Sequence, residues 1–168
     1  GGVHNSGLGV TTWRPSEVRD NNGNTIAFSQ YALGVLKEIT DSLGRTYWFS
    51  WQNLDGVNRL TSIEETSGGL GRRVEYAYYD GTEPESGNIG DLKTVTYRNS
   101  AGTVSRTVTY TYSESVDPEL NGNLLTITDS ENNTVLTNEY GTTGLAKGRV
   151  VRQTRDDGAG NISATNYH

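Results

Sequence analysis

The stretch at residues 92–112 reads LKTVTYRNSAGTVSRTVTYTY and holds the whole pattern of one β-hairpin. It opens at Leu92, places a second aliphatic residue at Val95, passes through a turn with Gly102 and closes on a run that ends at Tyr112. In that run, apolar residues alternate with threonine, which is typical of a half-buried strand. Glycine suits the turn because tight hairpins require a positive φ.

The same phrase recurs about six times along the chain. Residues 36–51 (LKEITDSLGRTYWFSW) and 124–140 (LLTITDSENNTVLTNEY) are two further clear copies. A unit repeated in this way indicates an array in which no single unit can bury its own apolar face. We therefore predict an all-β protein of tandem antiparallel β-hairpins, stacked as an extended repeat sheet or shell fragment.

The recurring aliphatic pairs define the predicted core, which we expect to form one buried face against the closing aromatic residues. The first unit carries Pro15 and Val18 at the corresponding places, and the last carries Val150 and Gln153. This register divides the chain into a lead-in segment, residues 1–16, and a hairpin-repeat domain, residues 17–168. The predicted core positions are Leu36, Ile39, Leu60, Ile63, Leu92, Val95, Leu124 and Ile127.

Composition narrows the function. A length of 168 residues suits one domain with a real core. The net charge of −6 disfavours nucleic acid and anionic membranes, whose phosphates require a basic surface. The sequence has no apolar run long enough for membrane insertion and no recognisable signal peptide. It has no cysteine, which rules out disulfides and thiolate chemistry and is compatible with export to the cell surface.

Catalysis has little support in the sequence, and we predict neither an enzyme nor a cofactor. The two histidines, His4 and His168, stand at opposite ends, whereas a catalytic relay requires a firmly held imidazole. Residues 20–24 (DNNGN) offer oxygen ligands as calcium loops do, but they also suit an ordinary hairpin turn, and the turn is the favoured interpretation. No metal site is predicted.

The repeat resembles the RHS/YD-repeat family, which includes bacterial rearrangement-hotspot proteins, toxin-complex shells and teneurins. Residues 148–167 fit the family phrase of G-R-L, D-x-x-G-N and a closing tyrosine, and residues 41–45 match its D-x-x-G-R turn. Tyr79-Asp80 is a literal YD pair. The resemblance implies hairpins that pair edge to edge in a strip, as in a hollow shell. The family's autoproteolytic core is not visible, so no catalytic residue is carried over.

Two functions follow as expectations. The first is an extracellular structural or assembly module, secreted or at the cell surface, that pairs with its own copies or with neighbouring repeats in a shell, stalk or fibre. The second is a carbohydrate-binding or adhesion module. Its candidate ligand-stacking residues are Trp13, Trp48 and Trp51. Because Trp48 and Trp51 are three positions apart, we expect them on opposite faces of a strand, one in the core and one exposed.

Overall fold

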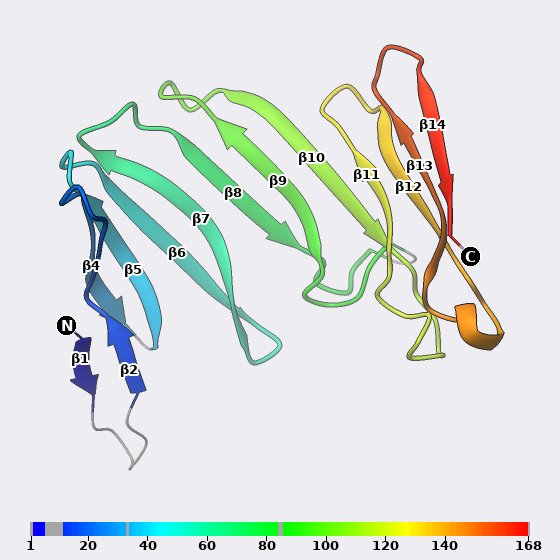
Figure 1. Cartoon of the computed structure of the whole chain (residues 1–168), viewed down its shortest axis with the longest axis horizontal. Helices are drawn as coiled ribbons and strands as arrows, with labels where there is room; N and C mark the ends of the chain where they lie inside the picture. Colours follow the sequence, from blue (N-terminus) through cyan, green and yellow to red (C-terminus); the bar gives the residue numbers. More distant parts are fainter. Residues whose placement is uncertain (1, 6–11, 33, 84–85, 168) are drawn as a thin grey trace.

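The chain forms one long antiparallel sheet in this computed structural model, which describes residues 2–5, 12–32, 34–83 and 86–167. Twelve strands, β3 to β14, follow one another in sequence order, and β1 and β2 form a separate pair. Figure 1 shows the strip as a curved layer that runs from the N-terminal to the C-terminal end. The predicted all-β fold of tandem hairpins is confirmed.

The strands have the following bounds: β1 Gly2–Asn5, β2 Thr12–Pro15, β3 Glu17–Arg19, β4 Thr25–Ala32, β5 Val35–Asp41, β6 Thr46–Leu54, β7 Val57–Ser67, β8 Arg73–Tyr78, β9 Leu92–Arg98, β10 Val104–Tyr112, β11 Leu124–Thr128, β12 Thr134–Tyr140, β13 Val150–Asp156 and β14 Ile162–Asn166. A short 3-10 turn, Gly144–Ala146, lies between β12 and β13. Among the described residues, no helix has the length and apolar character needed to span a bilayer.

A single turn design closes five of the six hairpins. In the β5–β6 hairpin, Asp41 Oδ1 accepts the backbone N–H groups of Leu43 and Arg45 at 2.9 and 3.0 Å. Gly44, with φ of 76°, donates its N–H to the Asp41 carbonyl. Asp and Asn suit this place because their short side chains hydrogen-bond the backbone two residues on. The equivalent residues in the other four turns are Asp20, Asn99, Asp129 and Asp157.

The β7–β8 hairpin has a longer tip and uses a longer carboxylate. Glu65 accepts the Leu70 N–H at 2.7 Å and donates its own N–H to the Arg72 carbonyl. Its side chain is only 3% exposed. Glu65 therefore closes this longer turn by binding its backbone, as Asp41 does in the shorter turn.

A β-bulge at each junction between hairpins explains the three-residue spacing of the aliphatic pairs. Tyr78 lies opposite Leu92, but Ala77 lies opposite Thr94, so Lys93 has no partner across the ladder. On a regular strand, residues three apart face opposite sides, and one extra residue restores them to the same side. The register also shifts at the other four junctions, where Lys37, Thr61, Leu125 and Val151 are extra residues. At the β4–β5 junction, Ser29 on the opposite strand is a second extra residue.

The two faces of the sheet differ in chemistry, because residues directly opposite each other across a ladder lie on the same face. The apolar face carries the aliphatic and aromatic residues of the repeat. The other face, called the polar face below, carries rows of small hydroxyl residues. One row runs through Ser50, Ser62, Glu75, Thr96 and Thr107, and another through Thr111, Thr126, Thr137 and Thr154.

The most buried part of the apolar face lies near the middle of the strip. Tyr79, Val95 and Val108 are 3%, 7% and 7% exposed, and they are the buried apolar residues of the described chain. Gly87 packs on the Tyr79 ring so closely that a Cβ there would lie 2.5 Å from a ring carbon. Most other apolar side chains of this face are half-buried, because the described part of the chain forms no second layer over it.

We predict that Val95→Ala lowers the free energy of unfolding by about 2 kcal/mol, since it removes two buried methyl groups and leaves a cavity. Val104→Ala is the matched control, because Val104 is 46% exposed, and it should change the value by less than about 0.5 kcal/mol. Urea unfolding followed by circular dichroism measures both. Equal effects of the two substitutions would show that the central core is misplaced.

The turn carboxylates predict how stability depends on pH. Hydrogen bonds from the turn hold the pKa values of Asp20, Asp41, Asp129 and Asp157 below their ordinary value of 3.8. An aspartate whose pKa is lower in the folded chain than in the unfolded chain stabilises the fold. This stabilisation is complete at pH values above the pKa of the unfolded chain, and it is lost as the pH falls through the pKa of the folded chain. The Tm should therefore fall on acidification below about pH 4.

Replacing all four aspartates with asparagine should remove about half of that acid-side fall, because Asn99 shows that an amide closes the same turn. The remaining fall belongs to Glu65, Asp80 and Asp117, whose pKa values are also lowered. Calorimetry between pH 6 and pH 3 measures the difference. A variant that loses as much stability as the native chain would contradict this role of the turns.

Candidate functional site

The apolar face is the candidate binding surface, and the structure brings all eight predicted core positions together on it. Each lies directly opposite an aromatic residue of the preceding hairpin, and residues opposite each other share a face. Val95 alone of the eight is buried, and the other seven are half-buried. The pairs are Tyr31–Leu36, Phe28–Ile39, Trp51–Leu60, Phe49–Ile63, Tyr78–Leu92, Tyr76–Val95, Tyr112–Leu124 and Tyr110–Ile127.

The closing tyrosines also donate hydrogen bonds from their hydroxyl groups to backbone carbonyls. Tyr78 donates its hydroxyl to the Leu60 carbonyl at 2.8 Å, and Tyr140 donates to the Leu124 carbonyl at 2.9 Å. Tyr31 reaches the Pro15 carbonyl at 2.9 Å. These bonds satisfy the polar tip of a ring whose body lies on aliphatic side chains, which is the usual environment of a packed tyrosine.

The two described tryptophans are not open platforms. Trp51 lies opposite Leu60 on the apolar face and donates its indole N–H to the Leu36 carbonyl at 2.6 Å. Trp48 lies opposite Glu38 and Glu64 on the polar face. Both indoles are half-buried, whereas one exposed tryptophan was expected. The side chain of the third candidate, Trp13, lies outside the described residues.

An amide pair replaces the apolar pair at the last junction. Asn138 lies opposite Gln153, and Gln153 Nε2 donates to Asn138 Oδ1 at 2.9 Å. Asn138 Nδ2 in turn donates to the Leu124 carbonyl at 3.0 Å, and the residue is 7% exposed. The substitution of Gln153 for an aliphatic residue in the repeat therefore comes with a matching polar residue on the neighbouring strand.

Tyr79 and Tyr112 form an aromatic contact where the strip is most buried. Their ring centroids lie 6.4 Å apart at an interplanar angle of 89°, an edge-to-face arrangement. Tyr79 donates its hydroxyl to the Tyr110 carbonyl at 2.8 Å. Burial, with a smaller contribution from Asp91, raises the pKa of Tyr112 to about 12. Tyr79 belongs to the YD pair of the sequence, so this pair marks a packing position.

A hollow of about 390 Å³ interrupts the apolar face over strands β6 to β9. We call it the β6–β9 groove. Ile63 and Val74 lie opposite each other in it, and Tyr47 and Tyr97 line it from β6 and β9. Glu65, Arg72, Arg73, Arg98, Asn99 and Ser105 complete the lining.

In the β6–β9 groove, the negative charge of Glu65 is buried, whereas the positive charge of Arg72 is exposed. Burial opposes ionisation of Glu65, but hydrogen bonds from Leu70 and Arg72 and the charges of Arg72 and Arg45 outweigh it, and its pKa is lowered. Arg72 Nε lies 3.7 Å from the Glu65 carboxylate, and the Arg72 side chain is 61% exposed. The groove therefore presents a guanidinium to solvent over an enclosed carboxylate.

Of the residues that line this groove, only Ile63 was predicted from the sequence, as a core position, and neither Glu65 nor Arg72 was among the candidate site residues. One feature of the sequence could have located this groove. At residues 65–72 a longer segment stands where the other units have a short turn closed by Asp or Asn, and a change in one unit of an array marks a locally different surface.

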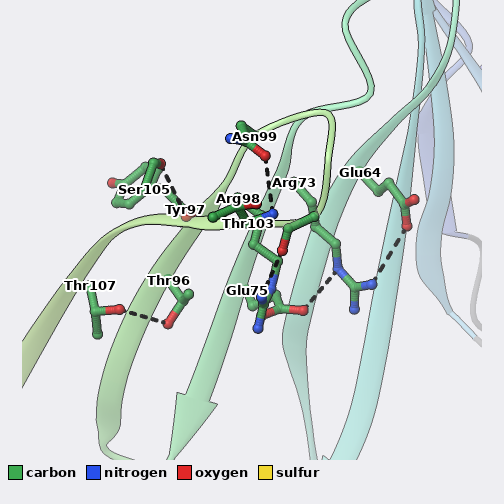
Figure 2. Close-up of polar contacts among 11 residues, drawn as sticks. Glu64, Arg73, Glu75, Thr96, Tyr97, Arg98, Asn99, Thr103, Ser105 and Thr107 are labelled. Carbon is green, nitrogen blue, oxygen red and sulfur yellow. Dashed lines mark hydrogen bonds and ion pairs between the residues drawn. The ribbon is translucent and has the colours of Figure 1, made fainter.

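On the polar face, the strands below the groove are joined by an ion-pair ladder (Figure 2). Arg73 contacts Glu64 at 3.9 Å and Glu75 at 3.2 Å. Glu75 also accepts Arg98 Nε at 2.7 Å. Side-chain exposures between 28% and 46% place this ladder at the surface, so it orients the side chains of β7, β8 and β9 more than it stabilises the sheet.

The described residues contain no group of three His, Cys, Asp or Glu side chains that could hold a metal ion. Asp20, the first residue of the calcium-like segment, accepts the N–H groups of Asn22 and Asn24 and the Asn24 side chain. Its carboxylate closes a hairpin turn. The His4 side chain and His168 lie outside the described residues.

Comparison with known families finds no matching family model, and comparison with curated proteins finds no match.

We predict that Asn138→Leu alone lowers the free energy of unfolding by about 1–3 kcal/mol, because it leaves the Gln153 amide without its partner. The double variant Asn138→Leu with Gln153→Ile restores an apolar pair and should recover most of the loss. Urea unfolding of the two variants measures the coupling. A double variant no more stable than the single one would show that the amide pair is not a substitute for the apolar pair.

Proposed function

We propose that this chain is an extracellular structural module of YD-like hairpin repeats that forms part of a shell, stalk or fibre. Its partners are copies of itself or neighbouring hairpin repeats. Turns closed by Asp or Asn, aliphatic pairs and closing aromatic residues recur along most of the strip, as the resemblance to RHS/YD repeats implies. The absence of cysteine from the sequence is compatible with a secreted or cell-surface location.

The observation that carries the proposal is the uncovered apolar face. A sheet whose apolar face is open gains stability by packing against another surface, and extended apolar patches of this kind mark protein interaction sites. Here aromatic and aliphatic residues line this face from β4 to β12, and most of them remain half-buried. The curvature of the strip in Figure 1 suits a wall that bends around a space.

The sheet also ends on an edge that suits strand pairing. Tyr167 donates its N–H to Val151, so alternation directs the N–H groups of Ile162, Ala164 and Asn166 to the free edge. Strand β14 carries no charged residue, and its five residues are exposed. Strand β3 at the other end is three residues long and carries Glu17 and Arg19, features that protect an edge from pairing.

We predict that the native chain associates in a concentration-dependent way and that Ala164→Pro weakens this association, because proline removes an edge-facing N–H. The midpoint concentration should rise at least about tenfold, or about 1.4 kcal/mol. Ala164→Val is the matched control, since it keeps the N–H and favours a strand, and it should associate as the native chain does.

Light scattering and negative-stain microscopy measure this association. A native chain that stays monomeric at high concentration would contradict assembly. Equal association of the native chain and Ala164→Pro would show that assembly does not use the β14 edge.

Carbohydrate binding or adhesion is the second candidate function, and the β6–β9 groove is the observation that favours it. The described tryptophans give it little support, because both are half-buried and Trp51 uses its indole N–H within the chain. The β6–β9 groove supports carbohydrate binding better than the tryptophans do, because it brings two tyrosines and an exposed arginine together.

A further inference from the structure

We propose that the β6–β9 groove binds a sugar ring that carries a carboxylate. The inference rests on the second candidate function and names its ligand class, but it does not depend on the proposed assembly, because it concerns a hollow within one chain. A volume of about 390 Å³ is in the range of small-ligand sites.

The floor and walls of the groove fit a flat, partly apolar ring. Ile63 and Val74 are directly opposite each other and form an apolar floor. Tyr47 and Tyr97 stand on strands three ladder spacings apart, about 14 Å between backbones, which leaves room for a ring between them. The C–H face of a pyranose packs on phenol rings, and the Tyr97 hydroxyl can exchange hydrogen bonds with its hydroxyl groups. The Tyr47 hydroxyl already donates to Glu65 Oε1 at 3.5 Å, so Tyr47 would contribute its ring.

Tyr97 is positioned for such contact. It is 39% exposed, and the Arg106 guanidinium lies 5.9 Å from its ring centroid. Arg106 lies opposite Tyr97 in the β9–β10 ladder, so its guanidinium packs on this ring from the neighbouring strand. Ser105 fixes the backbone at the same place by donating its hydroxyl to the Tyr97 carbonyl at 3.2 Å (Figure 2).

The charges at the groove select for an acidic ligand. Glu65 is enclosed, ionised and already bonded to the Leu70 N–H, so it is occupied within the fold. Arg72 touches Glu65 only through Nε at 3.7 Å, and its exposed end is free to form the paired hydrogen bonds that a guanidinium makes with a carboxylate. With a net charge of −6, the chain as a whole repels anions, so an acidic ligand should bind only at such a local positive site.

The test uses a galacturonic acid trisaccharide and its methyl ester as probes, titrated into the full chain below its association concentration. Calorimetry gives the affinity, and amide chemical shifts locate the binding. We expect the acid to bind at residues of the groove and the ester to bind at least about fivefold more weakly.

Substitutions in the groove separate the contributions of the Tyr97 ring and the Arg72 charge to ligand binding. Tyr97→Ala and Arg72→Gln should each weaken binding about tenfold, and Arg72→Gln should also abolish the preference for the acid over the ester. Tyr97→Phe should stay within about twofold, which shows that loss in Tyr97→Ala reflects the ring and not the fold. The controls are Tyr167→Ala and Arg19→Gln, which alter an exposed tyrosine and an equally exposed arginine elsewhere.

Three results would overturn the proposal: no shifts at groove residues with either probe, equal loss of binding in the controls, or binding of an acidic peptide in preference to the sugar acid. Failure of the sugar test leaves the assembly proposal untouched, since association is measured separately with Ala164→Pro.

Discussion

The cross-strand contact between an aromatic residue of one hairpin and an aliphatic residue of the next is the interaction on which the rest of this structure depends. In a sheet with no covering layer, each hairpin must obtain its apolar contacts from the hairpins beside it. Tyr76 on Val95 and Tyr110 on Ile127 are examples. Stability then resides in the junctions between neighbours, as it does in other repeat proteins.

Two devices hold that contact in register. At the tip of a hairpin, a carboxylate such as Asp41 binds the backbone of its own turn. At the other end, a bulge such as the one at Lys93 brings Leu92 and Val95 to the same face. A slip by one residue would place the polar face against aromatic neighbours, so a turn and a bulge in each unit oppose it.

Much of this fold could be predicted from the sequence, because alternation and turn composition are local signals. The order of the hairpins and the residues of the aliphatic pairs follow from the repeat. The bulges could not be placed, although the spacing of Leu36 and Ile39 was their signature, because a bulge is defined only by the strand opposite. The degree of burial was also overestimated, since sequence does not tell whether a second layer covers a sheet.

The candidate site was harder to predict because it depends on differences between units. Trp48 and Trp51 were predicted as ligand-stacking residues, but the Trp51 indole N–H donates a hydrogen bond to the Leu36 carbonyl within the fold. Glu65 and Arg72 come together only through the longer β7–β8 tip. Tyr97 is more exposed than the other tyrosines of β6 to β12, which no local pattern reveals.

The same face thus serves stability, the proposed assembly and the proposed ligand site. Closely packed units stabilise the strip, and open apolar rows favour a partner surface. The groove that places buried Glu65 beside exposed Arg72 favours a small acidic molecule. The register across the bulges is the claim that supports all three.

Nuclear Overhauser contacts between tyrosine rings and methyl groups test that register most directly. The structure predicts contacts from Tyr76 to Val95 and from Tyr110 to Ile127, with Tyr112 reaching Leu124 across the bulge. Contacts from Tyr112 to Leu125 in place of Leu124 would contradict it, because they would remove this bulge and turn Leu124 and Ile127 to opposite faces.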